Sequence, residues 1–129
     1  MMLNGFFRPV ILLVIVATVL QVSATTRADA AARGCLPGSI KAIFQQIESR
    51  FGRVRVISTF RKGARIAGSG RPSYHASCRA VDFHPPRGKY GAVLNYLRRN
   101  FSGGIGTYRC RMRHIHIDNG PRVRWSKCV

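Results

Sequence analysis

Two segments of the chain carry apolar residues at the spacing of an amphipathic helix. The first covers residues 39–51 and the second covers residues 90–100. Ser39 is a suitable N-cap for the first helix, and Gly52 is a suitable residue to end it. We assign both apolar stripes to the core. Their members are Ile40, Ile43, Phe44, Ile47 and Phe51 in the first helix, and Tyr90, Val93, Leu94 and Leu97 in the second.

Shorter segments have the pattern of β-strands. Alternating residues predict a strand over 54–58, and a short apolar run before two prolines predicts a buried strand over 80–83. The remaining strands are expected at 114–118, at 123–125, and after the glycines of 103–106 as far as Tyr108. Residues 61–72 are basic and contain glycines and one proline, which predicts a loop. Helices and strands follow one another without regular alternation, so the fold class expected is α+β.

The N-terminal segment has the composition of an export signal. The run from Val10 to Val22 is almost purely apolar, too short for a comfortable membrane span, and typical of the core of a secretory signal. Small residues ending at Ala24 or Ala30 suit a signal peptidase, and an uncleaved N-terminal membrane anchor is the alternative. The predicted organisation is a signal peptide over 1–24, a flexible leader over 25–34 and the working domain over 35–129. On either interpretation that domain lies outside the cytoplasm, in the periplasm or cell envelope.

The cysteines agree with export. Their number is four, all follow the apolar run, and an even number in a small exported domain predicts disulfides. A four-cysteine zinc site is disfavoured because no two cysteines form a Cys-x-x-Cys pair. Four cysteines allow three pairings, and their spacing does not choose among these. A working domain of about 100 residues has a small core, so disulfides and a metal would add stability that burial alone does not supply.

The net charge of the chain indicates only the sign of the charge on a binding partner. The chain has 22 lysines and arginines against 4 acidic residues, and its formal net charge is +18. Such a chain attracts polyanions, and an exported protein meets anionic envelope polymers and lipid head groups. A solvated basic surface is the alternative interpretation. An exported binder of nucleic acid or membranes would need only the charge and would leave the histidines unexplained, so no specific nucleic-acid partner is expected.

Histidines and acids gather in two short segments. His75 lies seven positions before Asp82, and His114, His116 and Asp118 alternate with isoleucines. Alternate side chains of a strand point to the same face, so the second group would share one surface. Each segment alone is weak evidence for a metal site. Together they contain three of the four histidines and two of the four acidic residues of the chain. Imidazole and carboxylate ligands with one water are typical of a catalytic zinc site.

These residues resemble a known family. Ser73-x-His75 followed by Ala80-x-Asp82 resembles the Ser-x-His-x-x-Gly-x-Ala-x-Asp motif of zinc D-Ala-D-Ala carboxypeptidases, which are grouped with lysostaphin-type endopeptidases and the signalling domain of hedgehog. RAVDF, KYGAVLNYL and RHIHID also look like the hedgehog version, whereas GGIGTY, HIDNG and RVRW are more similar to the small bacterial peptidases. The resemblance covers about residues 35–126. It implies a small antiparallel sheet with flanking helices.

The resemblance also implies roles for individual residues. His75, Asp82 and His116 match the three Zn²⁺ ligands, and His114 matches a histidine beside the metal that is a candidate general base. Arg61, in Ser58-Thr59-Phe60-Arg61, resembles an arginine that binds substrate and transition-state charge, which a guanidinium can do. The alternative for Arg61 is one more basic surface residue. Asp118 is expected to orient a neighbour by hydrogen bonding and is the next candidate base. His84 is expected behind the ligands or on the surface.

Two positions depart from the family pattern. Cys78 stands where the motif has glycine, and a disulfide at Cys78 would explain this and fix the metal-bearing loop. Arg113 stands where many of the carboxypeptidases have a glutamate base, three residues before the last histidine ligand. Among the three pairings we expect Cys35 with Cys78 and Cys110 with Cys128, because each would tie a terminus to the metal-bearing core.

The function expected from the resemblance is a monomeric zinc metallopeptidase that acts on peptidoglycan stem peptides, of the D-Ala-D-Ala carboxypeptidase or murein endopeptidase type. A zinc-bound water would attack the peptide carbonyl, with His114 as base. The alternative is a non-catalytic, zinc-containing cell-wall-binding module of the same fold. The missing glutamate favours the alternative, and His114 beside His116 opposes it. The basic surface would hold either protein on anionic wall material.

Overall fold

The computed structural model describes residues 32–128. The chain divides into two units, Met1–Ala31 and Ala32–Val129, and only the second is considered below. The expected signal peptide and most of the expected leader lie outside the described residues. The described part of that leader, residues 32–34, is helical. Within residues 32–128 no helix has the length and apolar character that crossing a membrane requires.

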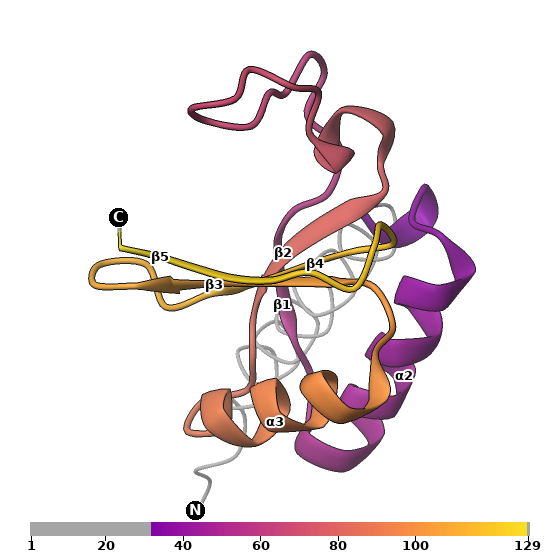
Figure 1. Cartoon of the computed structure of the whole chain (residues 1–129). Coiled ribbons are helices and arrows are strands. Elements are labelled where there is room, and N and C mark those ends of the chain that lie inside the picture. Colours follow the sequence, from indigo (N-terminus) through magenta and orange to yellow (C-terminus); the bar gives the residue numbers. More distant parts are fainter. Residues whose placement is uncertain (1–31, 129) are drawn as a thin grey trace, which may run out of the picture. The chain divides into compact units, whose positions relative to one another are not determined.

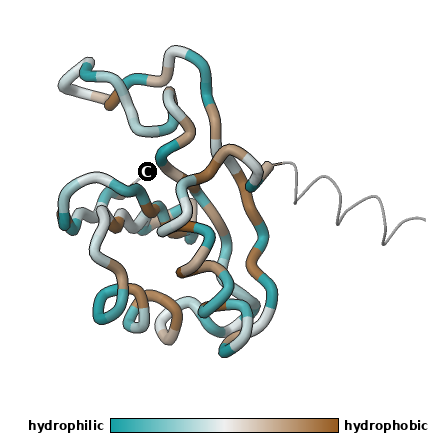
Figure 2. Tube along the Cα trace, turned by 90° about the vertical axis from the view of Figure 1, so that its right-hand side faces the viewer, coloured by the Kyte–Doolittle hydropathy of each residue, from teal (hydrophilic) through white to brown (hydrophobic). Residues whose placement is uncertain are grey.

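The second unit is an α+β domain, as the sequence predicts. Its elements are helices α2 (Gly38–Phe51) and α3 (Tyr90–Asn100), the short 3-10 helix η1 (Tyr74–Ser77), and strands β1 (Arg55–Ser58), β2 (Ala80–His84), β3 (Gly104–Arg109), β4 (Ile115–Asp118) and β5 (Arg124–Cys128). Helices α2 and α3 lie on one side of the sheet, and the loop between β1 and η1 projects on the other side (Figure 1). That loop is mainly hydrophilic, as its basic sequence predicts (Figure 2).

The sheet is mixed, which corrects the expectation of an antiparallel sheet. Its strand order is β1-β2-β4-β3-β5, and β5 pairs with β3 in parallel. The other neighbouring strands pair antiparallel. Both edges of β4 are occupied, by β2 and β3, so the strand that follows β4 cannot form a hairpin with it. The chain instead reverses after Asp118 and reaches the free edge of β3, beside which it runs parallel.

The two faces of the sheet have different chemistry because residues alternate along β4. Ile115 and Ile117 are fully buried in the hydrophobic core. Helices α2 and α3 cover that core with the predicted stripes, of which Ile40, Ile47, Val93 and Leu97 are also fully buried. His116 lies between the two isoleucines in sequence and therefore points to the opposite face. The polar residues of the sheet thus face away from the helices.

The first helix begins at Gly38, two residues before the start that Ser39 as N-cap would give, which corrects that assignment. Pro37 occupies the N-cap position, and no side chain caps the helix there. A proline that precedes the first turn fixes the backbone there without losing a helical hydrogen bond. Gly52 ends the helix as predicted, with a φ of 99° that favours glycine.

Both disulfides form in the predicted pairing. Cys35 bonds to Cys78, and Cys110 bonds to Cys128. Cys78 has a φ of 55°, in the left-handed region, which explains why the family motif has glycine at this position. The disulfide holds the cysteine in that unfavourable conformation and ties the end of η1 to the start of α2.

Candidate metal centre

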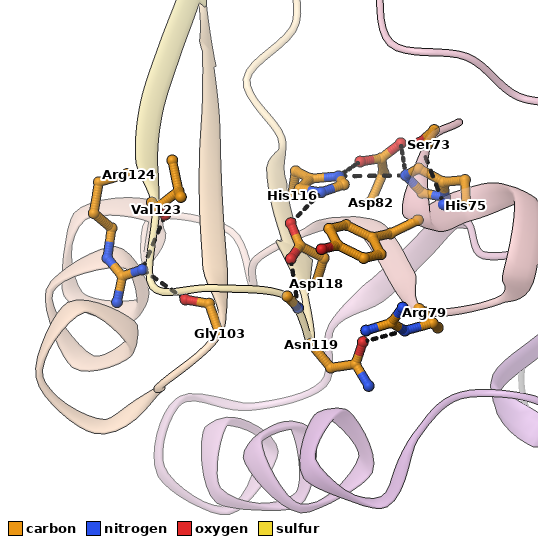
Figure 3. A network of polar contacts seen from close by, with 12 residues as sticks. Ser73, His75, Arg79, Asp82, Gly103, His116, Asp118, Asn119, Val123 and Arg124 are labelled. Carbon is orange, nitrogen blue, oxygen red and sulfur yellow. Dashed lines mark hydrogen bonds and ion pairs between the residues drawn. The ribbon is translucent and has the colours of Figure 1, made fainter. Parts of the chain in front are cut away.

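Strand pairing and one short helix bring three of the predicted residues together. Asp82 on β2 lies directly opposite His116 on β4 in the antiparallel register, so their side chains leave the same face of the sheet. His75 comes from η1, which immediately precedes β2. The Ser73 hydroxyl accepts a hydrogen bond from the His75 backbone N–H and caps η1. Figure 3 shows the three side chains pointing toward one another.

The three side chains form a compact buried cluster. Their potential ligand atoms all lie within 4.8 Å of one another. His116 Nδ1 is 2.9 Å from Asp82 Oδ1, and His75 Nε2 is 3.2 Å from Asp82 Oδ2. The two imidazole nitrogens, His75 Nε2 and His116 Nδ1, are 3.3 Å apart. The relative exposures of His75, Asp82 and His116 are 1%, 5% and 8%, so water screens these contacts little.

The outer nitrogen of each imidazole is held by an acceptor. His75 Nδ1 donates to the Thr59 backbone carbonyl at 2.6 Å, and His116 Nε2 donates to Asp118 Oδ2 at 3.1 Å. A neutral imidazole carries one N–H, so both inner nitrogens turn lone pairs toward the Asp82 carboxylate. Three electron-rich atoms therefore meet with no donor between them. This donor set fits a divalent cation such as Zn²⁺, whose histidine ligands are held by outer hydrogen bonds of this kind.

The electrostatics of the cluster agree with this arrangement. Burial alone would raise the pKa of Asp82, but the imidazoles of His116 and His75, which can carry a proton on the inner nitrogen when no metal is bound, outweigh it by hydrogen bonding and hold that pKa far below its usual range. Burial alone would lower the pKa of His116, but hydrogen bonds with Asp118 and Asp82 outweigh it and raise that pKa. The cluster thus favours an added positive charge at its centre, whether a proton or a metal ion.

Asp118 is fixed in position by the backbone around it. Its Oδ1 accepts the Gly120 N–H at 2.8 Å, while its Oδ2 accepts from His116. Gly104 leaves room for this carboxylate, because a β-carbon at residue 104 would overlap it. Burial tends to raise the pKa of Asp118, but the hydrogen bonds from His116 and Gly120 outweigh it and lower that pKa. Asp118 is therefore hydrogen-bonded to His116 and held in place by the backbone around it.

Arg61 lies at the open side of the cluster. Its guanidinium is 3.7 Å from Asp82 Oδ2, and the side chain is 53% exposed. Its backbone N–H donates to the His75 carbonyl at 2.9 Å, which ties the loop after β1 to η1. Arg61 is therefore an exposed basic residue at the edge of the cluster.

His114 is close to the cluster but is not one of its three members. It immediately precedes β4, is buried, and packs against the Tyr108 ring with a centroid distance of 4.2 Å. Burial keeps the pKa of His114 below its ordinary value, although the Asp82 carboxylate opposes this. The structure thus brings all six predicted site residues to one face of the sheet, with His114 and Arg61 beside the cluster.

Comparison with known proteins agrees with this geometry. The profile of the family described as Peptidase M15 matches residues 17–118. The chain belongs to the peptidase M15 family. Peptidoglycan L,D-endopeptidase MepK of Escherichia coli is 36% identical over 66 residues, which are 48% of this chain and 34% of that protein. The MepK protein of Shigella flexneri matches to the same extent. The chain thus spans about a third of the length of these curated relatives, and no solved structure matches it with significance.

Arg113, which stands where many M15-type carboxypeptidases have a glutamate, packs over Tyr90. Its guanidinium lies 5.7 Å from the centre of the Tyr90 ring. The Arg113 carbonyl lies 3.2 Å from His84 Nδ1, whose ring contacts that of His114 edge-on. His84 is therefore half-buried and contacts His114, outside the three-residue cluster. No acidic residue other than Asp82 and Asp118 contacts the cluster among residues 32–128.

Sequence reasoning missed two contributors to this M15 site. The Trp125 ring packs against the His116 ring with a centroid distance of 5.4 Å. Trp125 is the single tryptophan of the chain and lies opposite Gly106 in the β3–β5 pairing, so its rarity was the available signal. The Thr59 carbonyl, which holds His75, is a backbone group and carries no signal in the residue type.

Proposed function

We propose that the protein is a zinc-dependent peptidase that hydrolyses peptide bonds in peptidoglycan stem peptides. The observation that carries the proposal is the convergence of two imidazole nitrogens and a carboxylate at one buried point, with the outer nitrogen of each imidazole next to an acceptor. Membership of the M15 family and the likeness to a peptidoglycan endopeptidase support the chemistry and the substrate. The specific bond is of the D-Ala-D-Ala carboxypeptidase or murein endopeptidase type.

His75 Nε2, His116 Nδ1 and an Asp82 oxygen would hold the zinc ion. When bound by three protein ligands, zinc acts as a Lewis acid that makes water more acidic and polarises a carbonyl. Thr59 and Asp118 keep the two imidazoles in the tautomers that this role requires. The ligand arrangement is therefore fixed before an ion binds, which lowers the cost of binding it.

Two residues beside the cluster would act on the substrate. His114 would accept a proton from the attacking water at its unprotonated ring nitrogen and pass it to the leaving amine. Its place next to His116 and its packing on Tyr108 support this role, since they fix the imidazole beside the reacting atoms. Arg61 is exposed and reaches the edge of the cluster, so its guanidinium would bind the developing oxyanion or a peptide carboxylate.

The setting of this activity would be the periplasm or cell envelope. Two disulfides support an oxidising compartment. The net charge of +18 supports attraction to anionic wall material. We propose that the protein works as a monomer on peptidoglycan, with anionic envelope polymers as secondary contacts.

Incubating the zinc-supplemented protein with purified peptidoglycan tests the proposal. Mass spectrometry of the soluble fraction should identify new peptide fragments, and the masses should assign the bond that is cut. The His75→Ala protein serves as the matched control and should release none. Binding to peptidoglycan without any product from the zinc-loaded protein would instead favour the non-catalytic wall-binding module.

A further inference from the structure

A second candidate binding site lies where β2 leads into α3. An open pocket of about 310 Å³ is formed there by residues 84–88, Tyr90, Gly91 and Arg113, and we call it the 84–91 pocket. Its polar lining consists of His84, Arg87, Tyr90 and Arg113, and two prolines and two glycines complete it. The Arg113 guanidinium packs over the Tyr90 ring, which holds this positive group at the wall of the pocket.

The lining is cationic and has no carboxylate to balance it. The chain has four acidic residues, and the three that the structure describes are engaged elsewhere. Glu48 pairs with Arg33, and Asp82 and Asp118 pair with the histidines of the cluster. Within residues 32–128 neither Arg87 nor Arg113 forms an ion pair. An anion from outside the chain is therefore the natural complement of these guanidinium groups.

The pocket is continuous with the metal cluster along the sheet. Asp82 lies opposite His116, and the same register two residues further along brings His84 opposite His114. The rings of that second pair are 6.1 Å apart. Two residues of a strand span about 7 Å, which is also the reach of two residues of an extended peptide. His84 both contacts His114 and lines the pocket, so it connects the pocket with the residues beside the cluster.

We propose that the 84–91 pocket binds a carboxylate of the substrate peptide, about two residues from the bond presented to the cluster. This inference rests on the proposed peptidase function for the identity of the substrate. Guanidinium groups match the planar geometry of a carboxylate and bind it through paired hydrogen bonds. Arg113 thus replaces a family glutamate near the ligands with a cation that anchors substrate on the neighbouring surface.

Binding is tested on the metal-free protein by NMR, so that the result does not depend on turnover. The probe is a synthetic stem peptide with free carboxylates, and its fully amidated counterpart is the control ligand. The amide signals of Gly88 and Gly91 should shift saturably with the free peptide and not with the amidated one. Arg113→Gln and Arg87→Gln should each weaken binding about tenfold or more, the usual effect of losing a hydrogen bond to a charged group.

Arg99→Gln removes the same charge from an exposed position at the end of α3 and should leave the affinity unchanged. Equal shifts with the amidated peptide, or full affinity in Arg113→Gln, would overturn the proposal. Tighter binding of inorganic phosphate than of the free peptide would also overturn it, since the pocket would then take a phosphate of another wall polymer. 

A kinetic measurement separates this inference from the proposed function. On peptidoglycan peptides, Arg113→Gln should raise KM about tenfold and leave kcat unchanged, because the anchor contacts ground state and transition state alike. An inactive wild-type protein that still binds the free peptide at Gly88 and Gly91 would contradict the peptidase and support the pocket. If the wild-type protein is active and Arg113→Gln has an unaltered KM, the peptidase function is supported and the pocket proposal is contradicted.

Discussion

The Trp125 indole lies over Gly106, in the space that a β-carbon on residue 106 would occupy. The two residues are neighbours in the parallel pairing of β3 with β5, and Gly106 is also opposite His116 on β4. The missing side chain therefore lets an aromatic ring on β5 reach across β3 to a cluster histidine on β4. The indole contacts the His116 ring and, edge-on, the Tyr108 ring.

Adding a methyl group at this position should harm both stability and the cluster. Gly106→Ala forces the rigid indole to move, and overpacking of this kind costs about 1–3 kcal/mol. Displacing Trp125 also removes a packing surface of His116, so zinc affinity should fall with stability. Urea unfolding and metal titration measure the two effects. Gly38→Ala is the matched control, because its β-carbon meets open space, and it should unfold like the wild type.

Zinc should bind with one ion per chain and should depend on the three cluster residues. His75→Ala or His116→Ala removes one of three protein ligands and should abolish stoichiometric binding. His84→Ala also removes a histidine but lies outside the cluster, so its metal content should match the wild type. Elemental analysis after dialysis provides the measurement. Full zinc content in the His116→Ala protein would contradict the ligand assignment.

Asp118 should affect the affinity for the metal only through its hydrogen bond with His116. Asp118→Ala removes the acceptor of His116 Nε2–H, and loss of such an orienting carboxylate typically weakens metal binding about 10–100-fold. Asn119→Ala is the matched control, since Asn119 is adjacent but accepts from Arg79 on the surface. Competition with a zinc chelator should show the loss for Asp118→Ala and an unchanged affinity for Asn119→Ala. Equal affinities in the two variants would exclude the orienting role.

The sequence predicts the helices and most strands because each carries its own periodic pattern. The stripe of α2 and the alternation of β4 are local signals, and the structure confirms both. Alternation along β4 also predicts which residues face the site. The direction of β5 has no local signal, since it depends on both edges of β4 being occupied by other strands.

The difference between local sequence patterns and long-range strand pairing also explains which parts of the site could be predicted. His75, Asp82 and His116 carry the residue types of a metal site and match a family motif. The contact of Asp82 with His116 depends on strand register over 34 positions, which no local pattern specifies. Trp125 was missed for this reason too, because its approach to His116 requires the parallel pairing and the glycine between them.

The left-handed backbone at residue 78 should accommodate a cysteine only because the disulfide holds that residue in place. In a chain without the Cys35–Cys78 bond, residue 78 keeps its left-handed backbone, which costs a non-glycine residue about 1–2 kcal/mol. The double variant Cys35→Ala/Cys78→Gly should therefore be more stable than Cys35→Ala/Cys78→Ala by about that amount. Cys35→Ala/Cys78→Ala should be less stable than the wild type by about 4 kcal/mol, on loop-entropy grounds for a separation of 43 residues, and the glycine variant should lose about 1–2 kcal/mol less than that. Thermal or urea unfolding compares the three proteins, and equal stability of the two variants would exclude backbone strain.

His114 should be needed for turnover and not for metal binding. It shares the face of His116 but lies outside the three-atom cluster, and a fourth protein ligand would close the position that water needs. The family glutamate is replaced by Arg113, which leaves His114 as the first candidate for the proton acceptor. His114→Ala should therefore keep its zinc and lose about a hundredfold to ten-thousandfold in rate on peptidoglycan, the usual effect of removing a positioned base. Zinc content and product formation are measured on the same preparation. Loss of zinc would make His114 a ligand and the site a structural one, whereas full activity would move the base to another residue, with Asp118 the next to test.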